Sequence, residues 1–285
     1  HRDLHSFPTR RSSDLFARTV LFNADGPVRV GVGARFSASL DLAPGLVLST
    51  SVTKRIFDNF GEPAPSDSVL PRVRSDISLY SSRGDPAIES LTFAWYGRPG
   101  RDLYSRLTVG YLERMFGGVS AELLWKPVDS RLALGVEVNY VKQRDYDQLL
   151  GFRDYEVATG HVSAYYDFGN GFHGQVDVGR YLAGDWGATF TLDREFANGW
   201  KVGAFATLTD VSFDDFGEGS FDKGVRLTIP VNWMTGTPSR ASFPVTLRPV
   251  LRDGGARLEV DGRLYESIRD YHAHSLDTQW ERFWR

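Results

Sequence analysis

The stretch VSAELLWKPVDSRLALGVEVNY, residues 119–140, decides the fold. From Val119 to Trp125 every second residue is apolar, and the same alternation returns from Leu132 to Tyr140 after the turn PVDSR. Successive side chains of a β-strand point to opposite faces. The stretch therefore predicts a β-hairpin with one apolar face and one face of polar and small residues.

The same unit recurs along most of the chain. Alternating runs between Pro27 and Leu264, separated by turns such as GNG and ANG, predict about thirteen strands joined as neighbours. Residues 256–264 are expected to form the last strand, and residues 74–82 either a short helix or a further strand. Because no helical crossover separates the runs, we expect each strand to lie antiparallel to the next.

The connections between these strands differ in length at the two ends of the sheet. They are short at one end, whereas residues 58–85, 143–153 and 210–222 form long connections at the other. Outer-membrane barrels have this asymmetry, with short periplasmic turns and longer outer loops. With the short turns in the periplasm, the first strand would begin outside, so an even strand number implies that at least one strand is missing before Pro27, in line with an artefactual N-terminus.

Composition excludes several classes of protein. The chain has 285 residues, a net charge of -3 and no cysteine. The near-neutral balance gives no reason to expect nucleic acid as a partner, and the missing cysteines exclude disulfides and thiolate metal sites. No apolar run approaches the ~20 residues of a membrane helix, but the strands of a membrane barrel alternate instead.

Alternation alone does not decide which face meets water, because the apolar face lies inside a soluble barrel and outside a membrane barrel. Many runs reach the ~9–11 residues that a tilted membrane strand needs. Aromatic residues also lie near strand ends on the apolar face, as in an interfacial girdle: Trp125, Tyr140, Tyr166, Phe168, Trp186, Trp200 and Trp233. We therefore predict an all-β, antiparallel up-and-down transmembrane β-barrel of about 12–14 strands, with a soluble barrel or sandwich as the alternative.

The polar face should line a wet lumen. The candidate binding residues on it are Arg106, Glu122, Glu137, Tyr165, Asp177 and Arg226. Glu122 and Glu137 are expected to face each other on adjacent strands, and paired carboxylates can hydrolyse glycosides when suitably spaced. Arg106 and Lys126 should lie nearby, which favours a structural ion network, and we expect no catalytic residue.

No pattern indicates a metal or a cofactor. His161 and His173 have no third ligand that would suggest zinc. Nucleophile-elbow, P-loop and dinucleotide motifs are absent from the sequence. Residues 143–154 and 210–222 carry charges that could contact a sugar or a cation, although solvated loops are the favoured interpretation.

Several segments carry a resemblance to a known family: RSD (74–76), GDPAIESL (84–91), LERMF (112–116), WKPVDSR (125–131), NYVKQRDY (139–146), GRYLAGDWGA (179–188), DREFANGW (193–200) and GEGSFDKGVRLTIP (217–230). They resemble the YjbH/GfcD family of exopolysaccharide and capsule biosynthesis proteins, over about Val28 to Arg285. Members are longer, so the resemblance implies an N-terminally truncated, C-terminal barrel portion. The resemblance to this family implies no catalytic residues.

The resemblance also implies a place in the cell. It indicates a protein of the Gram-negative outer membrane, encoded with exopolysaccharide secretion genes. The implied partners are the exopolysaccharide, outer-membrane lipid and other envelope secretion proteins of the same polysaccharide system.

The two ends of the chain are expected to lie outside the barrel. Residues 1–15, HRDLHSFPTRRSSDL, resemble a translated sequencing adapter, so we assign residues 1–26 to an artefactual or disordered N-terminus. The barrel domain is predicted to span residues 27–266, and residues 267–285, which lose the alternation, form a C-terminal tail.

These observations predict a non-enzymatic outer-membrane β-barrel that takes part in exopolysaccharide or capsule biosynthesis, in secretion or surface assembly of the polymer. One alternative is a polysaccharide-modifying barrel enzyme that uses lumen carboxylates. The other is a purely structural surface barrel.

Overall fold

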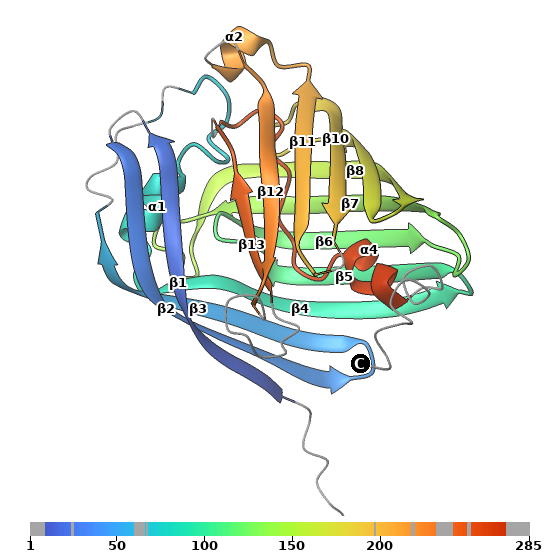
Figure 1. Ribbon diagram of the computed structural model, residues 1–285. Coiled ribbons are helices and arrows are strands. Elements are labelled where there is room, and N and C mark those ends of the chain that lie inside the picture. Colours follow the sequence, from blue (N-terminus) through green and yellow to red (C-terminus); the bar gives the residue numbers. More distant parts are fainter. Residues whose placement is uncertain are drawn as a thin grey trace, which may run out of the picture.

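The computed structural model describes residues 9–23, 26–59, 66, 68–196, 198–217, 220–231, 242–249 and 252–271. Its core is one antiparallel sheet of thirteen strands, in which each strand pairs with the next along the chain (Figure 1). The predicted all-β, up-and-down architecture is therefore confirmed. The strands are β1 (Thr9–Asn23), β2 (Gly26–Ala43), β3 (Leu46–Asp58), β4 (Ala87–Gly100), β5 (Leu103–Tyr111), β6 (Phe116–Trp125), β7 (Leu132–Arg144), β8 (Phe152–Gly169), β9 (Phe172–Arg180), β10 (Trp186–Glu195), β11 (Lys201–Thr209), β12 (Asp222–Pro230) and β13 (Ser242–Leu247).

The helices are short and lie between strands or after the last one. They are α1 (Ile77–Arg83), α2 (Phe213–Phe216), α4 (Leu264–Ile268) and the 3-10 turn η1 (Arg269–Tyr271). Helix α1 decides between the two alternatives that the sequence left open for residues 74–82. Across the described residues, none of the helices has the length and apolar character needed to cross a membrane.

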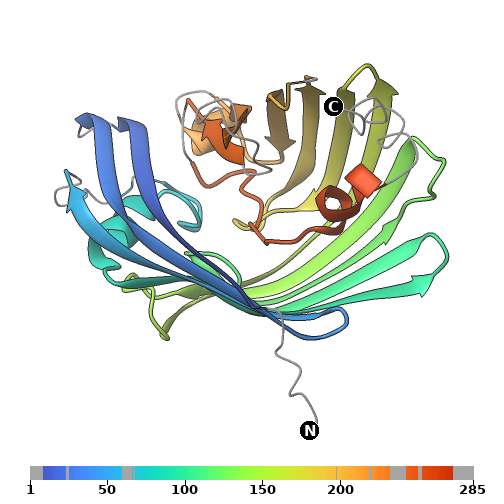
Figure 2. The same ribbon diagram turned by 60° about the horizontal axis from the view of Figure 1, so that its bottom comes forward.

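The sheet curves around an interior, and the stretch that contains α4 lies inside the curve (Figure 2). The pairings run in sequence order from β1 to β13. Between described residues, no pairing joins these two edge strands. The arrangement is thus a strongly curved up-and-down sheet with a filled concave side.

The two faces of the sheet have the distribution that the sequence predicted for a membrane barrel. On the outer face of β7, Val136 is 47% exposed and Val138 is 56% exposed, whereas Glu137 between them is buried on the inner face. Five of the predicted girdle residues are also exposed: Trp125, Tyr140, Tyr166, Phe168 and Trp186. Trp200 is half-buried, and Trp233 lies outside the described residues. This inverts the pattern of a water-soluble protein, whose charged side chains are mostly exposed.

The predicted difference in connection length between the two ends of the sheet is also confirmed, with one exception. Because successive connections of an up-and-down sheet alternate between its ends, residues 59–86, 145–151 and 210–221 all lie at one end. At the other end the turns are short except between β12 and β13, where residues 231–241 form the connection. Most of that connection lies outside the described residues.

At the N-terminal side the sheet begins earlier than predicted. Residues 9–23, assigned from the sequence to an artefactual or disordered N-terminus, form β1 and pair with β2 from Thr9–Leu40 to Asn23–Gly26. The strand was missed because its first half has no apolar alternation. Backbone hydrogen bonds of an antiparallel ladder do not depend on that alternation. A strand before Pro27 is thus part of this chain rather than missing from it, and the described sheet has thirteen strands instead of the even number that the parity argument expected.

At the C-terminal side the strand predicted for residues 256–264 is wrong. Residues 253–269, hereafter the inner segment, instead run through the interior as an irregular chain that ends in α4. Leu258 and Val260 alternate with Glu259 and Asp261, as in a strand. This irregular stretch alternates because Leu258 and Val260 pack into a buried cluster, whereas the side chains between and after them face an internal cavity.

Candidate functional site

The inner segment enters the interior at the end of the sheet that carries the long loops. The carboxylate of Asp253 accepts hydrogen bonds from the backbone N–H groups of Arg74 (2.7 Å) and Ser75 (2.9 Å), just before α1. The N–H of Gly255 donates to Asp185 in the turn between β9 and β10, at 2.7 Å. A side chain of the inner segment thus satisfies two backbone N–H groups before α1, and a side chain of the wall satisfies one backbone N–H of the inner segment.

This entry point depends on a glycine and a buried acid. Gly255 has φ +71°, and a Cβ at this position would lie 2.8 Å from Cγ2 of Thr207. Burial raises the pKa of the Asp185 carboxyl, and the hydrogen bond from Gly255 offsets only part of that effect. The positive φ of Gly255 and its close approach to Thr207 together require glycine at this position.

Halfway along the interior, the inner segment joins an ion network on the wall. Arg106 on β5 donates to Glu122 on β6 at 2.9 Å and lies 3.6 Å from Glu137 on β7. Glu122 and Glu137 occupy directly opposed positions of the β6–β7 register, as the sequence predicted. Arg263 of the inner segment then binds Glu137 with two hydrogen bonds, of 2.8 and 3.1 Å.

A second ion pair links the inner segment to β9. Arg257 lies 2.8 Å from Asp177 and 3.8 Å from Glu137. Ser163 and Gln175 donate further hydrogen bonds to Asp177. Arg257 and Arg263 of the inner segment therefore form ion pairs with two carboxylates of the surrounding strands, Asp177 and Glu137 respectively.

At the end with the short turns, the inner segment finishes in α4. The N–H of Leu264 donates to Glu122 at 3.1 Å, and Tyr265 stacks on Tyr165 of β8 with ring centroids 3.9 Å apart. Leu124 and Ala133 complete this buried cluster. The ring of Tyr165, one of the candidate binding residues of the polar face, is thus covered by Tyr265 of the same chain.

The structure brings together five of the six predicted binding residues. Arg106, Glu122 and Glu137 form one network, Asp177 joins it through Arg257, and Tyr165 packs beside it. Arg226 lies apart on β12, half-buried, and pairs with Asp193 of β10 at 2.6 Å. Lys126, expected nearby, is not in the network, because its ammonium group bonds the carbonyls of Pro127 and Ser130 in the turn.

Two cavities flank the inner segment. The larger has a volume of about 910 Å³ and lies against β2, β3 and β4. The smaller, about 270 Å³, lies against β8 to β13 and is lined in part by Tyr165, Asp177 and Arg226. Glu259 lines both cavities, so the inner segment forms a partition between them.

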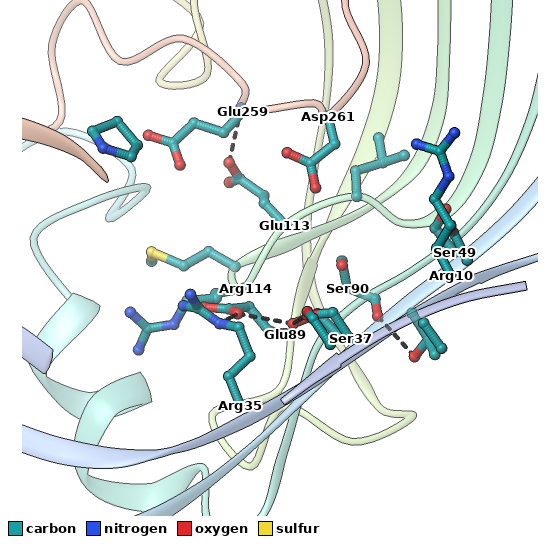
Figure 3. Close-up of a pocket in the computed structure, with 18 of the residues that line it drawn as sticks. Arg10, Arg35, Ser37, Ser49, Glu89, Ser90, Glu113, Arg114, Glu259 and Asp261 are labelled. Atoms are coloured by element: carbon teal, nitrogen blue, oxygen red, sulfur yellow. Dashed lines mark hydrogen bonds and ion pairs between the residues drawn. The ribbon is translucent and has the colours of Figure 1, made fainter. Parts of the chain in front are cut away.

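The larger cavity is lined by hydroxyl groups, by carboxylates and by five arginines, namely Arg10, Arg11, Arg35, Arg74 and Arg114 (Figure 3). Ser37 and Ser51 lie on the sheet side, where Arg35 binds Glu89 at 2.7 Å. Glu259 and Asp261 project into the cavity from the inner segment. Such a lining offers many hydrogen bonds to a hydroxyl-rich ligand.

The two charged loops have internal rather than ligand-like contacts. Arg144 is buried at the start of the 143–154 loop and donates to the carbonyls of Ile88, Glu113 and Gln148. Asp222 of the acidic loop pairs with Arg248 at 2.8 Å. In the part of the chain that the structure describes, no group of three or more acidic or histidine side chains is placed to hold a metal ion.

Sequence reasoning missed Arg263, Asp253 and Asp185, all of which fix the inner segment. One feature of the sequence could have indicated that residues 257–263 differ from a wall strand. In RLEVDGR, residues 257–263, every second residue carries a charge, with signs that change along the run. No other predicted strand places four charges in succession on one face, so this run differed from the lumen pattern elsewhere.

Comparisons with known proteins agree on the family. Residues 4–270 match the YjbH family model, described as "Exopolysaccharide biosynthesis protein YbjH". The chain is 36% identical over 248 residues to "Uncharacterized lipoprotein YjbH" of Escherichia coli (strain K12), which covers 84% of this chain and 35% of that relative. The chain thus spans about 35% of the length of the curated relative it matches. A solved structure of Salmonella typhi OmpF in complex with daunomycin is similar over 87% of this chain and 91% of that chain, with 9% identity and a TM-score of 0.47.

Proposed function

Because the chain belongs to the YjbH family of exopolysaccharide biosynthesis proteins, we propose that it is an outer-membrane β-barrel that secretes an exopolysaccharide or assembles it at the cell surface. The short turns would face the periplasm and the long loops the outside of the cell. Its partners would be the polymer, outer-membrane lipid and other envelope proteins of the same secretion system. The protein would act by binding and guiding the polymer, without catalysing a reaction.

The observation that carries this proposal is the inversion of the two faces of the sheet. Large apolar side chains such as Trp125, Val136 and Val138 are exposed on the outside, while Arg106 and Glu137 are buried inside. In water this distribution would cost free energy on both faces, since exposed apolar patches and buried charges are each unfavourable. In a bilayer the outer face meets hydrocarbon, and the inner face remains polar.

A genetic experiment tests the role in secretion. The complete gene is deleted, and the wild-type gene or an empty vector is returned on a plasmid. We expect the deletion to lower the extracellular polysaccharide while polymer or its precursors accumulate inside the cell, and the wild-type gene to restore export. Unchanged extracellular polymer in the deletion strain would contradict the proposal.

A polysaccharide-modifying enzyme is the second candidate, because Glu122 and Glu137 oppose each other directly in the register. Their contacts favour a structural role, since Arg106 binds Glu122 and Arg263 binds Glu137. Glu122→Gln and Glu137→Gln, each tested in the complete protein, separate the two candidates. If polymer secretion is lost while the protein still folds and reaches the membrane, chemistry at these carboxylates is favoured; an unchanged phenotype excludes it.

A further inference from the structure

We propose that the outer face of the sheet carries a binding site for one phospholipid, with the lipid phosphate on Arg194 and an acyl chain in the apolar groove beside it. This inference rests on the proposed placement of the sheet in a membrane. It goes beyond that placement because it names a ligand class, a position on the sheet and the residues that hold the ligand.

The groove crosses the outer face of β8 to β11, which are neighbours in the sheet. Its volume is about 480 Å³, within the range of ligand pockets, which is about 300–1,000 Å³. The rings of Tyr166 and Phe168, with centroids 5.0 Å apart, line it on β8. Ala204 and Ala206 line it on β11, where small side chains leave room for a ligand.

The register explains why the groove lies at this place. Gly174 of β9 is opposite Tyr166 of β8 and also opposite Leu192 of β10. A Cβ on Gly174 would come within 2.7 Å of the ring of Phe168, so this ring lies close over the glycine. Leu192 in turn is opposite Ala204. Small residues thus alternate with large ones across the strands, which leaves a depression bordered by aromatic rings.

Arg194 lies next to this groove, toward the end of the sheet with the short turns. It follows Leu192 by two residues on β10, so both side chains lie on the outer face. Its guanidinium carbon is 4.7 Å from the ring centroid of Phe172 and 4.9 Å from that of Phe196. These two rings hold an exposed cation at the border of an apolar surface.

The charge of Arg194 has no acidic partner among the residues that the structure describes. The neighbouring carboxylates of Asp193 and Glu195 lie on the inner face and pair with other arginines there. A guanidinium offers planar N–H donors that match the oxygens of a phosphate. Basic residues beside aromatic rings at the edge of a membrane surface lie at the level of the lipid headgroups.

The cation and the groove are close enough for one lipid to reach both. Two residues of an antiparallel strand span about 7 Å, which separates Arg194 from Leu192 in the groove. A free phosphate would leave the groove without a ligand, and an uncharged lipid would leave Arg194 without an anion. A phospholipid satisfies both features, and its headgroup would belong to the leaflet on the side of the short turns.

The test titrates the complete protein in detergent with three ligands and counts bound molecules by native mass spectrometry. The ligands are dioleoylphosphatidylglycerol, dioleoylglycerol, which has the same chains without the phosphate, and glycerol 3-phosphate, which has the headgroup without the chains. We expect the phospholipid to bind about tenfold more tightly than either fragment, the effect of one charge-assisted hydrogen bond. Equal binding of dioleoylglycerol or of glycerol 3-phosphate would overturn the assignment.

Two variants test the residues. Arg194→Gln should weaken the binding of dioleoylphosphatidylglycerol about tenfold and leave dioleoylglycerol unchanged. Ala204→Phe fills the groove and should weaken the binding of both lipids. The controls are Arg101→Gln, in the turn between β4 and β5, and Ala158→Phe, on the outer face of β8 nearer the long loops. Both should bind as the wild type does, and equal losses in Arg194→Gln and Arg101→Gln would overturn the site.

These outcomes are distinct from a failure of the proposed function. A protein that stays soluble without detergent and shows no heat-dependent band shift contradicts the membrane placement. A protein that needs detergent and shifts on boiling, but binds the phospholipid no more tightly than dioleoylglycerol, overturns the lipid site alone.

Discussion

Arg106 shows how strongly the interior depends on single charges. Its side chain is fully buried, donates to Glu122 at 2.9 Å and also reaches Thr108 and Ser120. Removing one partner of a buried ion pair leaves an uncompensated charge and costs about 3–5 kcal/mol. We therefore expect Arg106→Ala to lower the free energy of unfolding by about that amount, measured by urea unfolding in lipid vesicles.

Two variants control this measurement. Arg226→Ala removes an ion pair to Asp193 that is partly exposed on both sides, so we expect a loss of only about 0–1 kcal/mol. Arg106→Met/Glu122→Gln removes both charges of the buried pair and should recover much of the lost stability. Equal losses for Arg106→Ala and Arg226→Ala would show that the interior is solvated rather than buried.

Asp185 predicts a pH dependence at the entry of the inner segment. Burial raises the pKa of its carboxyl, so the folded protein holds this proton more tightly than the unfolded chain does. The free energy of unfolding should consequently fall as the pH rises through the shifted pKa. Asp185→Asn keeps an acceptor for the N–H of Gly255 and should remove that fall, in unfolding experiments at acidic and neutral pH.

The pH test has a clear contrary result. If Asp185→Asn and the wild type lose stability in parallel as the pH rises, the titrating group lies elsewhere. Asp129→Asn, at an exposed position in the connection between β6 and β7, is the control and should leave the pH profile unchanged.

At the scale of elements, β7 offers a test of what its outer face meets. Val136 is 47% exposed in the middle of the strand. An arginine facing lipid near the bilayer midplane costs about 2–4 kcal/mol in a membrane barrel. At an exposed position of a soluble sheet the cost is usually within about 0.5 kcal/mol. We expect the larger cost for Val136→Arg when folding into vesicles is titrated with urea.

The control for β7 lies in the turn that follows β6. Val128 is 43% exposed but belongs to the connection between β6 and β7, at the end with the short turns. Val128→Arg should therefore have little effect on stability. Equal small effects at both positions would argue that the outer face meets water.

Most strands could be predicted because one physical rule governs them. A strand between lipid and a polar interior must alternate, so β2 to β13 were visible as alternating runs. β1 was missed because its backbone pairs with β2 without an alternating pattern. The inner segment was misread because an irregular chain between a buried cluster and a cavity also alternates.

The candidate site was predictable only where the register decides it. Glu122 and Glu137 lie opposite each other because β6 and β7 form a hairpin whose turn fixes the pairing. Arg263 is 126 residues from Glu137 in sequence, and no hairpin connects them. Its contact follows from the path of the chain after β13, and periodicity carries no information about that path.

At the scale of the whole molecule, a sheet whose apolar face points outward curves around an interior that the chain itself occupies (Figure 2). In the proposed placement the exposed apolar face meets lipid, and the ion network lies on the opposite, inner face of the sheet. The inner segment supplies part of that network and reduces the open space to two cavities. Whether the sheet lies in a membrane therefore determines the meaning of every other contact.

The most direct test of that claim is fractionation of cells that express the complete gene, with each fraction run unheated and boiled on a denaturing gel. We predict recovery in the outer-membrane fraction and a folded band that changes mobility on boiling. A soluble periplasmic protein without a heat-dependent shift would contradict the account. The exposed apolar residues of the sheet would then need a protein partner instead of lipid.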